Sequence, residues 1–451
     1  MLDALATGFA GLAILVALIA ARMPIAYAMI LVGGAGIAVL GGPAILLAQL
    51  KTLAYGQFAT YDLSVVPMFV LMGALAARAG LSQDLFRAAR AWFGWLRGGL
   101  AMAAITACAG FGAVCGSSLA TASTMGRVAL PELKAHGYSG PFATGTLAAG
   151  GVLGILIPPS VVLVLYAVLV EANIVTMFMA ALLPGMIAVA MFLATIALVV
   201  ALRPASGPPS EAVGAAEFRR ASLGVIPVAV IFGLVIGGIY GGLFTPTPAA
   251  AAGVFLVTLY GAARRLLGWA ALRAALLETA RTTGMIYLIL LGAELLKIFM
   301  SRGGVPQATA AWLGGSGLPP LAILVLLLLA LILLGCLMDS LSMILLAIPF
   351  FWPVLVEING GLHAGAEGAF GMSTEELKIW FGILALIVVE LGLITPPVGM
   401  NVFIISSLDP ETPMAATFRG VTPFFLAEIL RVALLLGFPA IVLFLPRVLA
   451  G

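Results

Sequence analysis

The chain has 451 residues, of which 63% are hydrophobic and only 9% are charged, and its mean hydropathy is +1.22. Soluble globular domains carry about a quarter charged residues, so this composition excludes that class. Apolar stretches long enough to cross a bilayer recur from end to end, which predicts an all-α polytopic membrane protein. The net charge of +3 is spread over loops and does not indicate a nucleic-acid partner.

The first half of the chain predicts spans interrupted by two unusual segments. We expect spans at residues 4–21, 24–40, 64–79 and 174–202, and interfacial pieces at 44–60 and 83–97. Residues 98–131 predict a re-entrant hairpin whose arms meet at Gly116-Ser117-Ser118, and residues 144–170 predict a broken helix. The first stretch lacks a basic region before it, so we expect a span there and not a removed signal peptide. A polar, proline-rich linker at 203–222 follows.

The second half repeats this order. We expect spans at residues 223–241, 248–263, 285–300 and 421–445, and interfacial pieces at 268–282 and 305–313. A second hairpin, 318–353, has its tip at Met338-Asp339-Ser340, and a polar loop at 357–378 leads to a second broken helix at 379–406. The division that follows from this order is scaffold 1–97, hairpin and broken helix 98–173, last helix and linker 174–222, scaffold 223–317, hairpin and broken helix 318–408, and last helix 409–451.

A double proline interrupts each broken helix, at Pro158-Pro159 and at Pro396-Pro397. Proline has no N–H to donate, and its ring crowds the carbonyl four residues back. The carbonyls expected to lose their partners are those of Gly154, Ile155, Gly392 and Leu393. A bound cation, a water-lined cavity or a neighbouring helix would each satisfy them. Two matched breaks are typical of the central site of transporters built from repeats.

The symmetry of the repeat follows from the number of crossings. If each hairpin enters and leaves on one side, each half crosses the membrane five times, and the second half must be inverted. Placing the N-terminus outside puts most of the 21 basic residues in inside loops. The first hairpin then opens from the cytoplasm and the second from outside.

Several motifs resemble those of one family, the large membrane subunit of TRAP (tripartite ATP-independent periplasmic) transporters, which is called DctM-like. The matching stretches are residues 97–101, 154–160, 241–252 (GGLFTPTPAAAA), 338–343 and 392–401 (GLITPPVGMN). The resemblance covers essentially the whole chain. Two positions depart from the family pattern: Thr121 stands where some members have an acidic residue, and Pro248 stands where glutamate is usual.

This resemblance implies an elevator-type, sodium-coupled transporter in the bacterial inner membrane, with a periplasmic N-terminus. Its implied partners are a small DctQ-like membrane subunit and a DctP-like periplasmic binding protein that delivers an organic anion, such as a dicarboxylate. Na⁺ would be the coupling ion, and no other cofactor is expected. No nucleotide-binding domain is present in the sequence, so ATP is not expected as the direct energy source.

Hard cations bind oxygen ligands, so we expect sodium at the hairpin tips and breaks. The sodium candidates are Gly116, Ser117, Ser118, Gly154, Ile155, Asp339, Ser340, Gly392 and Thr395. Half-helices are expected to begin at Pro159 and Pro397 and to point their positive ends at a substrate carboxylate. The substrate candidates are Pro159, Ser160, Pro397, Gly399 and Asn401. The alternative for the serines is helix capping.

Other charged residues in apolar stretches need an explanation, because ionisable groups are costly there. Glu294 and Lys297 should pair, and so should Glu428 and Arg431. Arg127 should extend to the cytoplasmic interface, and for Glu390 structural and functional roles are both open.

Two other functions are considered. A self-sufficient sodium/dicarboxylate or arsenite-like carrier with the same inverted hairpins is the main alternative. A membrane-embedded hydrolase is weakly supported, because neither histidine, His136 nor His363, lies near Ser117 or Ser118 in the sequence to serve as a base. We therefore do not expect an enzyme.

Overall fold

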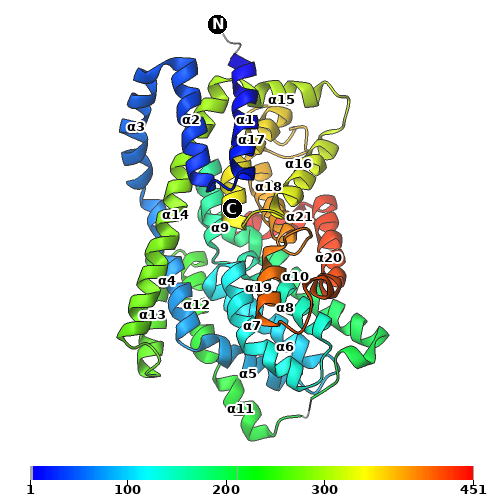
Figure 1. Cartoon of the computed structure of the whole chain (residues 1–451). Coiled ribbons are helices and arrows are strands. Elements are labelled where there is room, and N and C mark those ends of the chain that lie inside the picture. The colour runs from blue at the N-terminus through cyan, green and yellow to red at the C-terminus, as the bar shows by residue number, and fades with distance from the viewer. Residues whose placement is uncertain (1–3, 211, 450–451) are drawn as a thin grey trace.

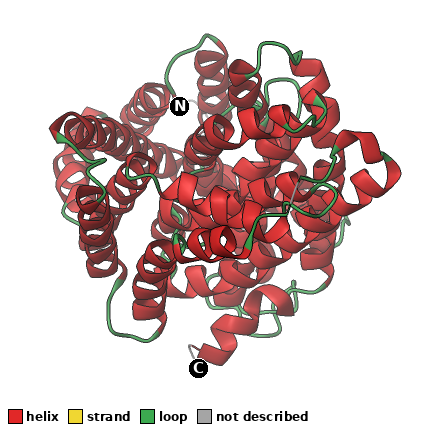
Figure 2. Ribbon diagram, turned by 90° about the horizontal axis from the view of Figure 1, so that it is seen from below, coloured by secondary structure: helices red, strands yellow, loops and turns green. Residues whose placement is uncertain are grey.

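The computed structural model describes residues 4–210 and 212–449, and every secondary-structure element within them is helical (Figure 2). The helices of the first half are α1 (Ala4–Ala20), α2 (Ile25–Gly41), α3 (Pro43–Phe58), η1 (Tyr61–Ser64), α4 (Val65–Arg78), α5 (Leu81–Phe93), α6 (Gly99–Cys115), α7 (Ser118–Ala135), α8 (Gly140–Leu156), α9 (Val161–Val170) and α10 (Ile174–Leu202). The linker contains η2 (Pro204–Ser206) and α11 (Ala215–Leu223).

The second half follows the same order. Its helices are α12 (Ile226–Tyr240), α13 (Pro246–Ala263), α14 (Trp269–Arg302), α15 (Val305–Gly314), α16 (Pro320–Gly335), α17 (Ser340–Asn359), α18 (Thr374–Gly392), α19 (Met400–Leu408), α20 (Met414–Gly437) and α21 (Ala440–Leu449). Both hairpins, α6–α7 and α16–α17, and both broken helices, α8–α9 and α18–α19, form as expected. The fold is therefore an all-α membrane fold with two repeats.

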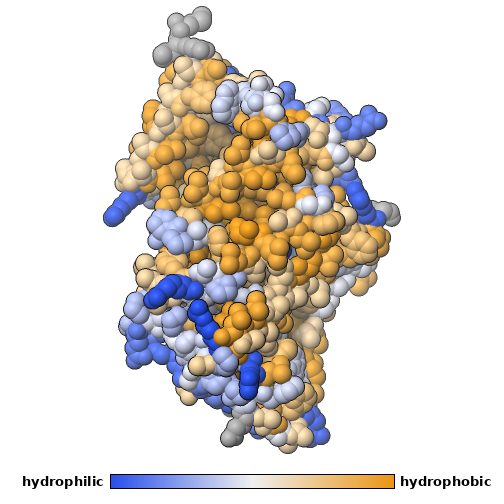
Figure 3. Space-filling model, turned by 90° about the vertical axis from the view of Figure 1, so that its right-hand side faces the viewer, coloured by the Kyte–Doolittle hydropathy of each residue, from blue (hydrophilic) through white to orange (hydrophobic). Residues whose placement is uncertain are grey.

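Apolar surface surrounds much of the molecule. Within the described residues, seven helices are long and apolar enough to cross a membrane, or eight if the bent pair α8–α9 counts as one span. The two members of that pair meet at an angle of 46°. Figure 3 shows a broad hydrophobic surface over the upper part of one face, with hydrophilic side chains gathered below it. This chain is a multi-pass membrane protein.

The helices separate into two groups (Figure 1). The scaffold is formed by α1–α4 with α12–α14, and within it α14 packs on α2 and α4 while α13 packs on α4. The hairpins and broken helices form the second group, which we call the hairpin domain. In Figure 1, α6 and α7 lie in the lower half of this domain, and α16 and α17 lie in the upper half. The two hairpins therefore approach the middle of the molecule from opposite ends, as an inverted repeat requires.

Several predicted elements have different bounds in the structure. The interfacial piece 268–282 and the span 285–300 form one 34-residue helix, α14, because the single Gly284 between them is not enough to end a helix. The predicted last span, 421–445, is two helices, α20 and α21, separated at Phe438 and Pro439. Pro248 lies at the third position of α13, which begins at Pro246, and a proline is tolerated in this first turn.

The linker is more ordered than its composition suggested. Its backbone bonds the first hairpin at three points: Gly98 N donates to Gly207 O, Ser139 N donates to Ser206 O, and Ser210 N donates to Gly94 O. The linker therefore holds the outer ends of the first hairpin, and it does not act as a loose tether.

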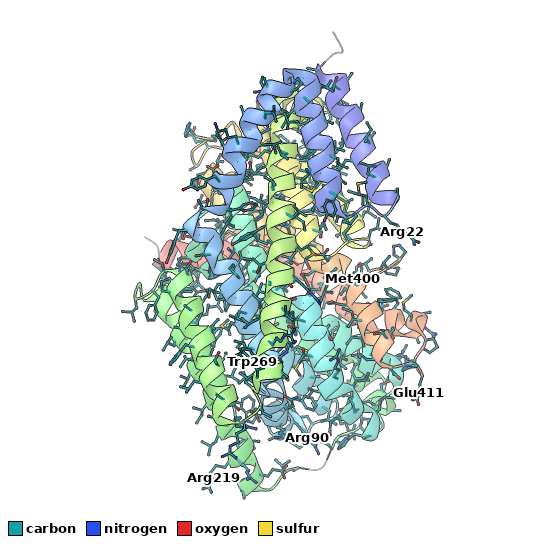
Figure 4. The ribbon with its side chains drawn as sticks, turned by 60° about the vertical axis from the view of Figure 1, so that its left-hand side comes forward. Arg22, Arg90, Arg219, Trp269, Met400 and Glu411 are labelled. Atoms are coloured by element: carbon teal, nitrogen blue, oxygen red, sulfur yellow. The ribbon has the colours of Figure 1, made fainter. Side chains whose placement is uncertain are left out.

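Basic side chains are unevenly placed along the molecule. Figure 4 shows Arg90 and Arg219 near the lower end, whereas Arg22, at the turn between α1 and α2, lies about half-way up. The helices α1 and α2 thus occupy only the upper half of the scaffold. The N-terminal residues 1–3, whose side of the membrane was predicted, lie outside the described residues.

Candidate functional site

A cavity of about 620 Å³ lies between the scaffold and the hairpin domain. Both hairpin tips line it: Gly116, Ser117 and Ser118 from the first, and Asp339 and Ser340 from the second. The scaffold wall is made by α4, including Gly73 and Ala77, and by Glu278 and Thr282 of α14. A cavity of this size suits a small organic molecule. Two tips that are more than 200 residues apart in sequence therefore share one space.

The first tip is a tight turn that starts a helix. Gly116 adopts φ +65°, a left-handed conformation that favours glycine, and it ends α6. Ser117 caps α7 by accepting a hydrogen bond from Ala120 N at 3.4 Å. The predicted alternative for the serines is thus confirmed at Ser117. Ser118 is buried, and its hydroxyl donates to Glu390 Oε1 at 3.4 Å.

The second tip has the same design with different side chains. Asp339 caps α17, where its Oδ2 accepts a hydrogen bond from Ser342 N at 3.1 Å. Ser340 is buried, and its hydroxyl donates to Glu390 Oε1 at 2.6 Å. The repeat therefore places a capping residue and then an inward-facing serine at each tip.

The first break packs directly against the first tip. A Cβ on Gly154 would lie 2.7 Å from Ser117 O, and a Cβ on Gly116 would lie 2.9 Å from Pro159 O. Since neither position can accept a larger side chain, the tip and the break touch through backbone atoms. Pro158 and Pro159 cannot bond the carbonyls of Gly154 and Ile155, as expected, and Ile155 also lines the cavity.

The second break differs from the expectation. The carbonyls of Gly392 and Leu393 are not left free, because Thr395 N and Asn401 N donate to them, each at 3.0 Å. The Thr395 hydroxyl, just beyond the end of α18, donates to Leu391 O at 2.6 Å. The backbone folds back after α18, so the N–H groups of Thr395 and Asn401 bond the carbonyls that Pro396 and Pro397 cannot. Gly392 packs against α16, since a Cβ there would lie 2.6 Å from Gly335 C.

The predicted substrate residues do not form one cluster. Ser160 is buried and caps α9, which begins two residues after Pro159. The second half-helix, α19, begins at Met400, so Pro397 is an exposed residue before it and not its first residue. Gly399 supplies a left-handed conformation, φ +55°, before α19. These four residues are absent from the cavity wall, so they shape the breaks and do not line the space.

Asn401 links the two repeats. It is fully buried, and its Nδ2 donates to Ala148 O of α8 at 3.4 Å. A Cβ on Gly151 would lie 3.0 Å from that nitrogen and 3.2 Å from Ser118 O. Within the described residues, Asn401 Oδ1 and the nearby Thr121 Oγ1 are buried without a hydrogen-bond partner. Both oxygens remain available as acceptors beside the first tip.

Four charged residues belong to the site although the predicted set omitted them. Glu390 is completely buried and joins both tips through its Oε1. Arg127, which was predicted to extend to the cytoplasmic interface, is exposed and lines the cavity. Arg78 and Glu278 form an ion pair of 2.7 Å at the cavity wall. The position of Glu390, two residues before Gly392, was the sequence signal for its role.

The other predicted ion pairs are confirmed. Lys297 and Glu294 lie 3.6 Å apart on α14. Arg431 and Glu428 pair on α20, and both side chains are at most 1% exposed. Within the described residues, no cluster of three or more His, Cys, Asp or Glu side chains could hold a metal ion. A cation at this site would therefore depend mainly on hydroxyl and carbonyl oxygens.

Comparison with known proteins identifies the family. Residues 12–441 match the family described as the DctM component of the tripartite ATP-independent periplasmic transporters. The chain belongs to this family. It is a TRAP transporter large permease, and this is a family of transport proteins and not of enzymes.

Relatives of this permease span nearly its whole length. The C4-dicarboxylate TRAP transporter large permease DctM of Pseudomonas aeruginosa is 32% identical over 409 residues, covering 88% of this chain and 90% of that one. The sialic acid TRAP transporter large permease SiaM of Vibrio cholerae is 30% identical over 440 residues, covering 96% and 97%. The crystal structure of the Alcanivorax borkumensis YdaH transporter has a TM-score of 0.60 at 17% identity, over 87% of this chain and 88% of that one. That similarity shows a shared fold.

Proposed function

We propose that this permease couples the entry of Na⁺ to the uptake of an organic carboxylate across the bacterial inner membrane. The observation that supports this most strongly is the meeting of both hairpin tips at one cavity between scaffold and hairpin domain. Paired half-helices and non-helical backbone at such a point provide oxygen ligands for a cation and N–H groups for an anion. Relatives named for C4-dicarboxylates and for sialic acid both act on carboxylates, which supports this substrate class.

The donors at the site suit Na⁺. The hydroxyls of Ser118 and Ser340 and the backbone oxygens around Ser117, Gly154 and Pro159 are hard ligands, which hard cations prefer. One sodium ion is proposed between the first tip and the first break. A second is proposed between Asp339-Ser340 and the turn from Gly392 to Thr395. Arg127, on the cavity wall, is a candidate contact for the substrate carboxylate.

The interface between the two groups of helices supports transport by an elevator motion. The cavity wall on α4 consists largely of small residues, and a Cβ on Gly73 would lie 2.8 Å from Cys115 O at the end of α6. Small residues allow helices to approach closely and to move past each other without interlocking side chains. We propose that the hairpin domain slides along α4 and α14 and so carries the cavity from one side of the membrane to the other.

The proposed partners follow from the family. They are a small DctQ-like membrane subunit and a DctP-like periplasmic binding protein, which would deliver the anion to a periplasmic face. The N-terminus is proposed to be periplasmic, because that orientation puts most basic residues inside.

Reconstitution tests this function. The permease is placed in liposomes with the small subunit, and uptake of radiolabelled succinate and of sialic acid is measured with the binding protein outside. An inward Na⁺ gradient should drive accumulation, whereas a K⁺ gradient of the same size should not. Equal uptake under both gradients would reject sodium coupling. Uptake by the chain alone would favour the self-sufficient carrier.

A further inference from the structure

Glu390 forms hydrogen bonds with both hairpin tips. It lies near the end of α18 and is completely buried. Its Oε1 accepts hydrogen bonds from Ser118 at 3.4 Å and from Ser340 at 2.6 Å. These serines lie 272 and 50 residues away in sequence. A single carboxyl group therefore connects the two ends of the inverted repeat.

The charge around Glu390 does not balance. Glu428 and Arg431 on α20 are also buried, and they pair with each other, so Arg431 forms no salt bridge with Glu390. Asp339 is nearby and adds negative charge, although it is half-buried and faces the cavity. A buried charge without compensation is strongly destabilising. Glu390 therefore needs either a cation nearby or a proton on its carboxyl group.

No other described charge near Glu390 supplies this compensation. The helices α8, α9, α10 and α16, which pack on α18, contain no charged residue. The remaining charges of α18, Glu375, Glu376 and Lys378, are at its opposite end, where Lys378 pairs with Glu375 and Arg447 pairs with Glu376. On α17 the other charged residue, Glu357, lies in the last turn, far from the tip. A bound cation would supply the compensating charge, and without one the carboxyl group would take up a proton.

The hydrogen bonds show how one carboxylate can serve two ion sites. A serine hydroxyl has one donor and two acceptor lone pairs. Ser118 and Ser340 use their donors on Glu390, which turns their lone pairs away from the carboxylate and leaves them free for a cation. Glu390 Oε2 is buried and has no hydrogen-bond partner among the described residues, so this oxygen can still accept a bond.

We propose that Glu390 is a positioning residue for both sodium sites: it orients one serine ligand from each hairpin and supplies the negative charge that the two ions share. This rests on the proposed sodium coupling. Because both sites share the same counter-charge, Na⁺ bound at these sites takes the place of the proton that would otherwise neutralise Glu390. Sodium binding then stabilises the arrangement in which the two tips are held together.

The test separates charge from hydrogen bonding. Glu390→Gln keeps the shape of the side chain and an oxygen that accepts from both serines, but it removes the charge. The purified permease is heated in increasing NaCl, with choline chloride holding the ionic strength constant, and the rise in melting temperature reports Na⁺ binding without transport. We expect the half-saturating Na⁺ concentration to increase by about tenfold or more, the effect of losing a unit charge a few ångströms from an ion.

Two further variants provide the controls. Glu375→Gln makes the same change of charge on the same helix but at an exposed position, and its Na⁺ response should match the unmodified protein. Ser340→Ala keeps the carboxylate and removes the shorter of the two hydrogen bonds, and it should also weaken Na⁺ binding. It serves as the test if Glu390→Gln does not fold.

The outcomes distinguish the inference from the function on which it rests. If Na⁺ stabilises the unmodified protein and the Glu390→Gln and Ser340→Ala variants to the same degree at the same concentrations, Glu390 has no role in ion binding and the inference is wrong. If Na⁺ does not stabilise the unmodified protein more than choline does, sodium coupling itself is rejected.

Discussion

The two breaks share a sequence pattern but lie in different surroundings. Residues 157–160 of the first break are all buried, and the first tip covers them. In the second break Pro396, Pro397 and Val398 are exposed. Before the second break, the carbonyls of Gly392 and Leu393 accept hydrogen bonds from Thr395 N and Asn401 N. In the first break, Pro158 and Pro159 have no N–H with which to bond the carbonyls of Gly154 and Ile155. The first break is therefore covered by protein, whereas the second break is exposed.

The difference arises from packing and not from the motif itself. The first break is enclosed by the tip at Gly116 and by α10, where a Cβ on Gly185 would lie 3.0 Å from Leu156 O. The second break has a closely packed aromatic neighbour in Phe418, whose ring would lie 2.9 Å from a Cβ on Gly399. Two related halves in unlike environments are what a transporter needs if it exposes its site to one side at a time.

The largest expected contrast is in chemical accessibility. Ser160 and Val398 occupy matching positions after the double prolines, yet Ser160 is 0% exposed and Val398 is 36% exposed. A cysteine at position 398 should react readily with a water-soluble maleimide, whereas a cysteine at 160 should stay unmodified. The natural cysteines, Cys108, Cys115 and Cys336, are buried and should give little background. Equal labelling of Ser160→Cys and Val398→Cys would contradict the asymmetry.

The next contrast concerns the backbone contacts at each break. Gly154→Ala would push a methyl group against Ser117 O, and Gly392→Ala would push one against Gly335. Overpacking of this kind costs about 1–3 kcal/mol of stability, so each variant should unfold at a lower temperature and should take up substrate more slowly. Gly237→Ala is the control, because nothing lies within 4 Å of its added methyl group. Normal uptake by both break variants would show that these contacts are not needed.

A smaller effect is expected at the caps of the two tips. Asp339→Ala removes the cap of α17 and should destabilise the protein by about 1 kcal/mol, while also weakening Na⁺ binding. Asp339→Asn should retain most of the stability, because asparagine is an equally good cap. Thermal unfolding with and without Na⁺ measures both quantities. Unchanged sodium-dependent uptake by Asp339→Ala would remove this residue from the site.

The smallest effect is expected at an ion pair that connects the repeats outside the membrane. Lys134 on α7 bonds Asp409, which follows α19, at 2.7 Å. Burial raises the pKa of Asp409, but bonds from Lys134 and Thr412 outweigh this and the pKa is lowered overall. A carboxyl whose pKa is lowered by folding stabilises the folded state at any pH above its pKa in the unfolded chain, which is about 3.9. This contribution should therefore be lost as the pH falls below about 4.

Hydrogen exchange of residues 409–412 tests this pair. The protection factor, which is the exchange rate of an unfolded chain divided by that of the protein at the same pH, should be high at neutral pH and should decrease as the pH falls below about 4. The Asp409→Asn variant should have a lower protection factor at neutral pH, and this factor should change little further in acid. A variant that exchanges as slowly as the unmodified protein would show that the pair does not hold this loop.

The sequence predicted the order of hairpins and broken helices well, because double prolines, glycines and apolar runs act locally. It also predicted the tip residues that line the cavity, such as Ser117 and Asp339. It failed where distant packing decides. The bonds from Thr395 N and Asn401 N to Gly392 and Leu393 depend on how the chain returns after Pro397. The contact of Glu390 with both tips depends on two hairpins that only the folded chain brings together.

The central claim is that the two hairpin tips meet at one point. Because Ser118 and Ser340 bond the same oxygen of Glu390, their hydroxyls are no further apart than the sum of those two bond lengths. The most direct measurement is cross-linking of the double variant Ser118→Cys, Ser340→Cys by a bifunctional thiol reagent small enough to enter the cavity that both positions line, in a background without Cys108, Cys115 and Cys336. We predict an intramolecular cross-link that neither single variant forms. Modification of both cysteines without any cross-link would contradict the account.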